Sequence, residues 1–163
     1  MSKLYVLVGL PGSGKSLWIE KHLTDNDVHI SRDEIRFELL EPNDEYFKHE
    51  DLVFNRFVEH INFGLRSGFN VFADATHISK GSRWKLLSRI NVPNTEVAAI
   101  WIRTPFEQTL IQNAQREGRA LVPEDVIYNM RKGFQAPTFE EGFSEIYIIE
   151  PNKPIEIIRK GDK

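Results

Sequence analysis

The sequence predicts a three-layer α/β/α sandwich with a mainly parallel sheet. Over its 163 residues, short apolar runs alternate with segments whose apolar residues recur at helical spacing. This alternation is typical of parallel β-α-β units, in which helices cover both faces of the sheet. Ligands of such folds bind beyond the carboxyl ends of the strands, so we expect the functional residues directly after the strands.

The predicted strands are short runs rich in Val, Ile and Leu. The first one carries a single positive charge and leads straight into a glycine-rich turn, which indicates a strand and not a signal peptide. The strands are expected at 3–8, 28–31, 70–73, 96–102, 146–149 and 155–158.

The predicted helices have apolar residues every three to four positions. Ser31 and Glu34 form a capping box at the start of one helix, Gly68 ends the longest, and Pro123 begins the last. The aromatic stretch between Tyr46 and Phe63 could form core or wall an acceptor pocket, and helical spacing favours core. One helix is expected to begin at Lys15, and the others to cover 33–40, 44–67, 80–90, 105–116 and 123–132.

Composition restricts the function classes. The chain is 40% hydrophobic and 28% charged, as in globular proteins, and no apolar run approaches the ~20 residues that span a bilayer. The absence of cysteine excludes disulfides and thiolate metal sites and suits a reducing compartment, so we expect a cytoplasmic protein with no membrane contact. No linker divides the sequence, and we expect a single domain over 1–163.

A net charge of −3 excludes a uniformly basic nucleic-acid-binding surface, so any nucleic acid would need a local basic cluster. Each candidate cluster could equally be a solvated helix face. The candidates are Arg83-Trp84-Lys85 with Arg89, Arg116 with Arg119, and Arg131-Lys132.

The segment after the first strand, G-L-P-G-S-G-K-S from Gly9 to Ser16, matches the phosphate-binding loop G-x-x-x-x-G-K-[ST] in full. Its glycines let successive N–H groups face phosphate oxygens, and the following helix contributes its dipole. Lys15 can reach the β- and γ-phosphates, and the Ser16 hydroxyl can bind Mg²⁺. We expect a nucleoside triphosphate to contact Gly9, Pro11, Gly12, Ser13, Gly14, Lys15, Ser16 and Leu17.

Asp33 and Arg36 follow the second strand, on one face of a helix. A carboxylate can orient an acceptor hydroxyl and accept its proton, and an arginine beside it can hold an anionic group. From spacing alone, a surface ion pair in the first helical turn is the favoured explanation, because such pairs are common.

Two further segments carry residue types that are expected at a phosphoryl-transfer site. Asp74 ends the third strand, where a carboxylate can hold a Mg²⁺-bound water or pair with Lys15, although it could also be a helix cap. Nearby His77 fits a polar surface residue. Arg116 and Arg119, in a segment spanning 113–123, could form a lid that neutralises the transferred phosphoryl group, or an exposed basic turn.

The ordered set of these segments resembles the kinase domain of phage polynucleotide kinases, which phosphorylate 5′-hydroxyl ends of DNA or RNA. The resemblance rests on G-x-P-G-S-G-K-S, then S-R-D-E-x-R, then Asp74-Ala75-Thr76 and the arginine-bearing lid. It implies a P-loop NTPase fold, with Asp33 as general base and Arg36 on the 3′ phosphate of the acceptor. It also places Thr76 and Arg83 at the substrate.

In the lid, a basic residue often found in that family three positions before Arg116 is Asn113 here, so either lid arginine could act, and we expect Arg116. Lys15, Asp33 and Arg116 are thus the expected catalytic residues. The phosphatase motif D-x-D-G-T that often follows in this family does not occur, and we expect no 3′-phosphatase activity.

The resulting hypothesis is ATP- and Mg²⁺-dependent phosphorylation of the 5′-hydroxyl end of DNA or RNA, as in nucleic-acid repair, with no protein partner indicated. One alternative is a kinase for a nucleoside, nucleotide or other small molecule, because fold alone does not determine the acceptor. Another is a nucleotide-dependent binding module that hydrolyses slowly, in which Asp33 would have no purpose.

Overall fold

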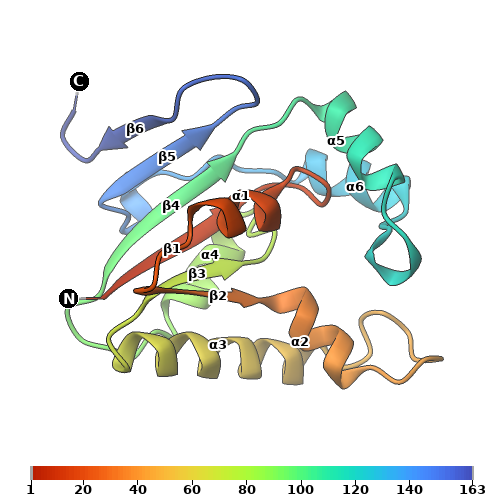
Figure 1. The fold of residues 1–163 in the computed structure, drawn as a ribbon, viewed down its shortest axis with the longest axis horizontal. Helices are drawn as coiled ribbons and strands as arrows, with labels where there is room; N and C mark the ends of the chain where they lie inside the picture. The colour runs from red at the N-terminus through yellow and green to blue at the C-terminus, as the bar shows by residue number, and fades with distance from the viewer. Residues whose placement is uncertain (1, 163) are drawn as a thin grey trace.

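The computed structural model, which describes residues 2–162, has a six-stranded sheet with helices on both faces (Figure 1). The strand order is β2-β3-β1-β4-β5-β6; all neighbouring strands are parallel except the antiparallel pair β5 and β6. The predicted mainly parallel sandwich is therefore confirmed. The strands are β1 (Lys3–Val8), β2 (Asp27–Ser31), β3 (Asn70–Asp74), β4 (Glu96–Ile102), β5 (Glu145–Ile149) and β6 (Glu156–Arg159).

Helices cover the sheet from two sides, with α1 in front of it and α4 behind it in Figure 1. Ile19 of α1 packs with Leu7 of β1 on one face, whereas Phe57 of α3 and Leu86 of α4 belong to the larger core on the other face. The helices are α1 (Lys15–His22), α2 (Arg32–Leu39), α3 (Glu50–Arg66), α4 (Lys80–Leu87), α5 (Phe106–Ala114) and α6 (Glu124–Lys132), with 3₁₀ turns η1 (Gly118–Ala120) and η2 (Phe139–Glu141). No helix in the described residues is long and apolar enough to cross a membrane.

The long helix α3 lies very close to the sheet because it carries a glycine at the contact. A Cβ atom on Gly64 would stand 2.9 Å from a methyl group of Val71 and 3.3 Å from one of Val28. Glycine inside a helix costs about 0.5–1 kcal/mol relative to alanine, so its place here reflects this close approach.

The carboxyl ends of β1, β2 and β3 meet at one edge of the sheet. Ser31 at the end of β2 is in register with Asp74 at the end of β3, and β3 pairs with β1. The segments that follow these strands are therefore neighbours, as expected for a parallel sheet.

One helix is shorter than the apolar spacing of its sequence predicts. The helix expected over 44–67 begins only at Glu50, and the chain before it forms turns. Arg119 donates to the main-chain carbonyls of Glu41 and Pro42, and the Tyr46 hydroxyl bonds to Asp33. These long-range contacts hold the segment in a loop, which periodicity cannot show.

Candidate active site

The phosphate loop connects β1 to α1 in a conformation that requires its glycines. Gly12 and Gly14 have φ angles of 85° and 101°, in the left-handed region where side chains are strained. A Cβ on Gly12 would also stand 2.8 Å from the carbonyl oxygen of Thr109. At the start of the loop, the Gly9 N–H donates to the Thr76 carbonyl at 3.0 Å, which ties the loop to the end of β3.

Lys15 folds back over this loop. Its ammonium donates to the carbonyls of Gly9 and Leu10, each at 3.0 Å, and the residue is 8% exposed. Burial lowers the pKa of Lys15 to about 8, although the nearby Asp74 carboxylate acts in the opposite direction. The ammonium is thus held next to main-chain N–H groups where a phosphate can bind.

Ser16 and Asp74 form the oxygen pair that could hold a magnesium ion. The Ser16 hydroxyl donates to Asp74 Oδ2 at 2.6 Å, and His29 Nε2 bonds to the same oxygen at 2.8 Å. Burial raises the pKa of Asp74, but the bonds from His29 and Ser16 and the charge of Lys15 outweigh it and hold the pKa below its ordinary value. Magnesium prefers such oxygen ligands together with waters and phosphate oxygens, so the pair fits the ion. Within residues 2–162 no three His, Asp or Glu side chains gather as a metal site of their own.

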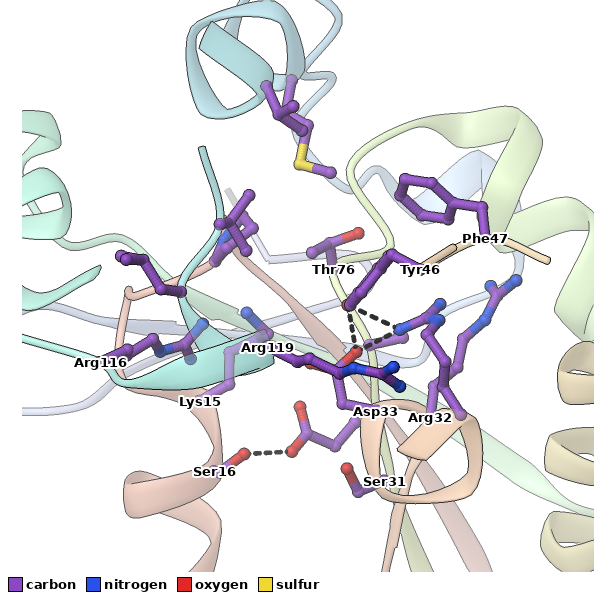
Figure 2. A pocket seen from close by; sticks show the side chains of 18 of the residues that line it. Lys15, Ser16, Ser31, Arg32, Asp33, Tyr46, Phe47, Thr76, Arg116 and Arg119 are labelled. Carbon is purple, nitrogen blue, oxygen red and sulfur yellow. Dashed lines mark hydrogen bonds and ion pairs between the residues drawn. The ribbon is translucent and has the colours of Figure 1, made fainter. Parts of the chain in front are cut away.

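Asp33, Arg36, Tyr46 and Glu50 form a second set of contacts, the Asp33 cluster. Figure 2 shows its members Asp33 and Tyr46 pointing toward one another. Arg36 NH1 donates to the Asp33 carboxylate. The Arg36 residue is buried, with only 6% of its surface exposed. The Tyr46 hydroxyl donates to Asp33 at 2.8 Å and accepts from Arg36 at 2.9 Å. Glu50 binds the other side of the guanidinium, through Nε at 3.0 Å and through NH2.

The Asp33 carboxylate is the exposed member of this cluster. Its side chain is 53% exposed, against 7% for Arg36 and 27% for Glu50. Asp33 is therefore oriented by two neighbours and still open to a ligand. Burial and the adjacent Asp33 charge raise the pKa of Tyr46, so its hydroxyl stays protonated as a donor.

The lid segment over 113–123 contributes its two arginines differently. Arg116 NH1 donates to the Ala120 carbonyl at 3.2 Å, within the segment itself. Arg119 instead reaches the loop before α3 and caps carbonyls there. Asn113 is 1% exposed and exchanges two hydrogen bonds with the main chain of Val122, which fixes both ends of the segment. A basic side chain at this position could not accept the bond from the Val122 N–H, because lysine and arginine have no acceptor atom.

A cavity of about 560 Å³ brings these parts together. The phosphate loop, the Asp33 cluster and the lid all contribute residues to its lining. Figure 2 shows Lys15, Asp33 and Arg116 around the same space. Of the predicted site residues, Pro11, Lys15, Ser16, Asp33, Arg36, Asp74, Thr76, Arg116 and Arg119 line this cavity. Gly9, Gly12, Ser13 and Gly14 shape the loop behind it, and Leu17 is 58% exposed on α1 beside it.

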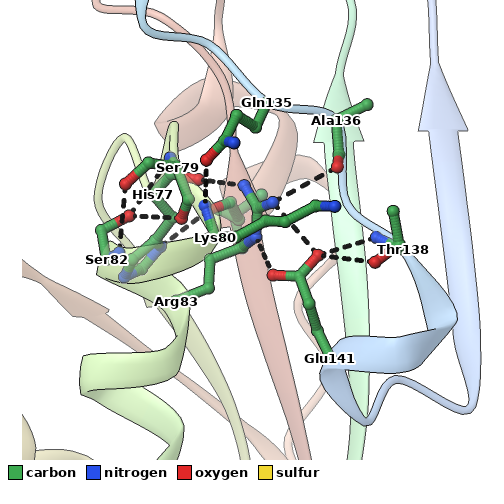
Figure 3. A network of polar contacts seen from close by, with 10 residues as sticks. His77, Ser79, Lys80, Ser82, Arg83, Gln135, Ala136, Thr138 and Glu141 are labelled. Atoms are coloured by element: carbon green, nitrogen blue, oxygen red, sulfur yellow. Dashed lines mark hydrogen bonds and ion pairs between the residues drawn. The ribbon is translucent and has the colours of Figure 1, made fainter.

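Arg83 lies apart from the predicted site residues, in the core (Figure 3). It is fully buried and donates to Glu141 through Nε at 2.6 Å and NH2 at 3.1 Å. The carbonyls of His77 and Ala136 accept its remaining bonds. Its four hydrogen bonds join α4 to Glu141 of η2 and to the main chain of His77 and Ala136, so the geometry gives Arg83 a structural contact where the resemblance implied a substrate contact.

His77 also differs from expectation, because it is buried and not a surface residue. It is 5% exposed, with a φ of 44°, and its Nδ1–H donates to the Leu7 carbonyl at 2.7 Å. Burial lowers the pKa of His77 to about 4, so the ring is neutral near pH 7.

Four residues make contacts at the site that the sequence did not predict: His29, Tyr46, Glu50 and Asn113. Only His29 had a local signal, because it lies two positions before Ser31 on a strand whose end was expected at the site. The partners of Tyr46, Glu50 and Asn113 are 9 to 14 residues away in the sequence, and no short spacing rule connects them. Phe47 also lines the cavity and is 58% exposed, so part of the aromatic stretch is wall, whereas Phe54 and Phe57 are core.

Comparison with known families agrees with this geometry. The model of the family AAA_33, described as an AAA domain, matches residues 4–137, from β1 through the lid to the loop after α6. The chain belongs to this AAA-domain family. Its phosphate loop and mainly parallel sheet are those of a P-loop fold.

Among curated proteins, the chain is 28% identical over 151 residues to a protein of Acanthamoeba polyphaga mimivirus provisionally named a bifunctional polynucleotide phosphatase/kinase. The match covers 88% of this chain and 32% of the mimivirus protein, so the chain spans about a third of that relative.

Solved structures share the fold at lower identity. A chain of the Pnkp1/Rnl/Hen1 RNA repair complex has a TM-score of 0.66 and 24% identity, over 81% of this chain and 43% of that one. Kti12 of Chaetomium thermophilum in complex with ADP-AlF3 has a TM-score of 0.63 and 16% identity, covering 91% and 89% of the two chains. A sugar kinase from Janibacter sp. HTCC2649 has a TM-score of 0.61 and 15% identity, covering 94% and 88%.

Proposed function

We propose that this P-loop protein is a kinase that transfers the γ-phosphate of ATP to the 5′-hydroxyl end of a polynucleotide. The observation that carries the proposal is the Asp33 carboxylate, which is exposed in the cavity that Lys15 and Ser16 also line. A group that accepts a proton from a hydroxyl needs this position, whereas a nucleotide-dependent switch does not. The mimivirus relative and the Pnkp1 structure support a polynucleotide acceptor.

In the proposed reaction, Asp33 accepts the proton of the 5′-hydroxyl as its oxygen attacks the γ-phosphorus. The bond from that phosphorus to the bridging oxygen breaks, leaving ADP, and the acceptor gains a phosphomonoester. Lys15 and Arg116 neutralise charge on the transferred phosphoryl group. Ser16 and Asp74 would hold Mg²⁺, which supplies charge neutralisation at the phosphate oxygens when bound.

Arg36 would hold the phosphate on the 3′ side of the terminal nucleotide. Its guanidinium is already turned toward the cavity by Glu50 and Tyr46, so little side-chain freedom is lost on binding. Arg119 lines the cavity as well. Its bonds to the 41–44 loop favour a role in closing the acceptor side of the cavity, and not a contact with the donor phosphates.

A small-molecule kinase is the second candidate. The Janibacter sugar kinase shares the fold over 94% of this chain, and a cavity of about 560 Å³ is large enough for a compact acceptor. The absence of a protein partner remains a prediction, because the solved Pnkp1 chain lies in a complex with Rnl and Hen1.

The deciding experiment offers labelled ATP with a panel of acceptors: a 5′-hydroxyl oligonucleotide of DNA or RNA, free nucleosides, sugars and water. We expect label on the oligonucleotide and none on an otherwise identical 5′-phosphorylated one. Transfer to a nucleoside or a sugar alone would favour the small-molecule reading. Transfer to water alone would contradict both kinase proposals.

A further inference from the structure

Three cations surround a single aromatic ring just outside the cavity. Phe54 of α3 has the ammonium of Lys85 at 4.3 Å from its ring centroid, and the guanidinium groups of Arg32 and Arg89 at 5.5 Å and 5.6 Å. Phe54 itself is 5% exposed, whereas Lys85 and Arg89 are exposed on or just after α4. We call Arg32, Lys85 and Arg89 the Phe54 cations.

The positive charge of this group is poorly compensated. Among the described residues, no ion pair within 4 Å involves Lys85 or Arg89, and the Arg89 guanidinium donates to the amide oxygen of Asn55. Arg32 lies 3.8 Å from Glu50, a carboxylate that Arg36 already binds through two nitrogens. The Nε of Arg32 is buried and has no hydrogen-bond partner among the described residues.

This arrangement favours an anionic ligand. An exposed cation–π contact contributes only about 0.5–1 kcal/mol, and three like charges around one ring repel each other. A buried donor without a partner also costs free energy that a bound oxygen would recover. An anion with several charged oxygens would satisfy the donors and reduce the repulsion together.

The Phe54 cations continue directly from the cavity. Arg32 lines the cavity, and its neighbour Arg36 shares the Glu50 carboxylate with it. Glu50 and Phe54 lie one turn apart on α3, which places Lys85 and Arg89 one step further from Asp33. A chain of contacts therefore leads from Asp33 through Arg36 and Arg32 to the surface of α4.

We propose that the Phe54 cations bind the phosphodiester backbone of the acceptor strand, beyond the terminal nucleotide that Arg36 holds. This inference rests on the proposed function and specifies how the acceptor enters: the strand leaves the cavity past Arg32 and follows α4. Guanidinium groups bind phosphate oxygens in pairs, and the flexible lysine adapts to a mobile single strand. The same helix exposes 71% of Trp84, an aromatic face on which a base can stack.

The test compares two acceptors of different length in the full chain: a nucleoside 3′-monophosphate, which ends at Arg36, and a 5′-hydroxyl dodecamer, which would reach α4. The double variant Lys85→Gln with Arg89→Gln removes both charges and keeps most of the aliphatic length that packs on Phe54. Lys85→Arg with Arg89→Lys keeps the charges. Lys21→Gln on α1, an exposed lysine on the opposite face of the sheet, is the matched control.

We expect the double glutamine variant to raise the KM of the dodecamer about tenfold while its kcat and the KM of the nucleoside 3′-monophosphate stay unchanged. Loss of two phosphate contacts should also reduce the slope of log KM against log salt by about 1.4. The charge-preserving variant and Lys21→Gln should behave as wild type. A merely structural role would lower the melting temperature and affect both acceptors alike, and that result, or an unchanged KM for the dodecamer, would overturn the inference.

The proposed function can fail separately. If wild type phosphorylates neither acceptor, fluorescence anisotropy of a labelled dodecamer still measures binding to the Phe54 cations. Weaker binding by the double glutamine variant than by Lys21→Gln would support the strand path without the reaction, and equal binding would reject it.

Discussion

The phosphate loop is made of eight consecutive residues, whereas the Asp33 cluster joins residues from α2, the loop after it and the start of α3. Main-chain groups and glycine conformations define the loop, so its shape follows from the local sequence. Side-chain ion pairs define the cluster, and every member depends on a partner at a distance. The proposed donor side of this site is thus encoded locally, and the proposed acceptor side is assembled by folding.

The two regions also differ in what a ligand has to replace. Lys15 bonds only to two loop carbonyls, which leaves its charge free for phosphate oxygens. Arg36 is already bound to Asp33, Tyr46 and Glu50. An anionic acceptor must therefore share the guanidinium with these groups, which should make acceptor binding more sensitive to substitution than donor binding.

The first pair of predictions, Asp33→Asn and Lys15→Ala, has the largest expected effects and separates the two regions by their chemistry. Asp33→Asn keeps the shape of the side chain but removes its basicity, and should lower kcat for 5′-hydroxyl transfer about 10³-fold. The Kd of ATP should stay within about twofold, because the phosphate loop is intact. Single-turnover transfer of labelled phosphate, with ATP binding measured separately, checks both values.

Lys15→Ala is the counterpart on the donor side. It should abolish transfer to every acceptor, water included, because the loop loses the cation that faces the phosphates.

Full oligonucleotide transfer by Asp33→Asn would show that the carboxylate is not the base.

The next prediction concerns the scaffold behind the loop, where His77 bonds to the Leu7 carbonyl near the end of β1. The folded pKa of about 4 lies below the ordinary 6.5, because burial disfavours the charged ring. The charges of Arg32 and Lys15 act in the same direction, and Asp74 opposes them. Between these pH values the unfolded state binds the additional proton, so the contribution is present above pH 6.5 and is lost as the pH falls toward 4.

His77→Asn should remove this pH dependence. Asparagine tolerates the positive φ and can still donate near Leu7, but it does not titrate. Urea unfolding at pH 7 and pH 4 should show a difference of about 3 kcal/mol between the pH responses of wild type and variant. Identical pH responses would mean that His77 is protonated in the folded protein or is not buried in solution.

The contrast between the two regions explains how far the sequence could predict this structure. The strands and the phosphate loop follow from hydrophobic pattern and local spacing, and both were predicted within a few residues. The helix expected to begin near Asp44 was wrong at its start, because its aromatic periodicity is real but Tyr46 and Phe47 face the cavity and not the core. Arg119 holds that loop from a distance of over 70 residues in sequence, and no local pattern contains such a contact.

Arg83 and Asn113 show the same limit for single residues. Spacing after a recognisable motif suggests a position in the chain but not the direction of a side chain. Arg83 points from α4 into the core toward Glu141, 58 residues later, and Asn113 points toward Val122 across the lid. Their environments become visible only when the layers of the fold are assembled.

The smallest expected effect tests whether the assembled contacts of the Asp33 cluster matter to the proposed reaction. Tyr46→Phe removes one hydroxyl, which donates to Asp33 and accepts from Arg36, and leaves the ring against Phe37 and Phe47. Loss of one hydrogen bond to a charged group is worth about 1.5 kcal/mol, so kcat/KM for the acceptor should fall about tenfold. The KM of ATP should not change, since Tyr46 lies on the acceptor side alone. Tyr128→Phe, an exposed tyrosine on α6 that packs on Phe106, is the matched control. If both variants behave as wild type, Arg36 alone orients Asp33, and the acceptor side is simpler than its hydrogen bonds indicate.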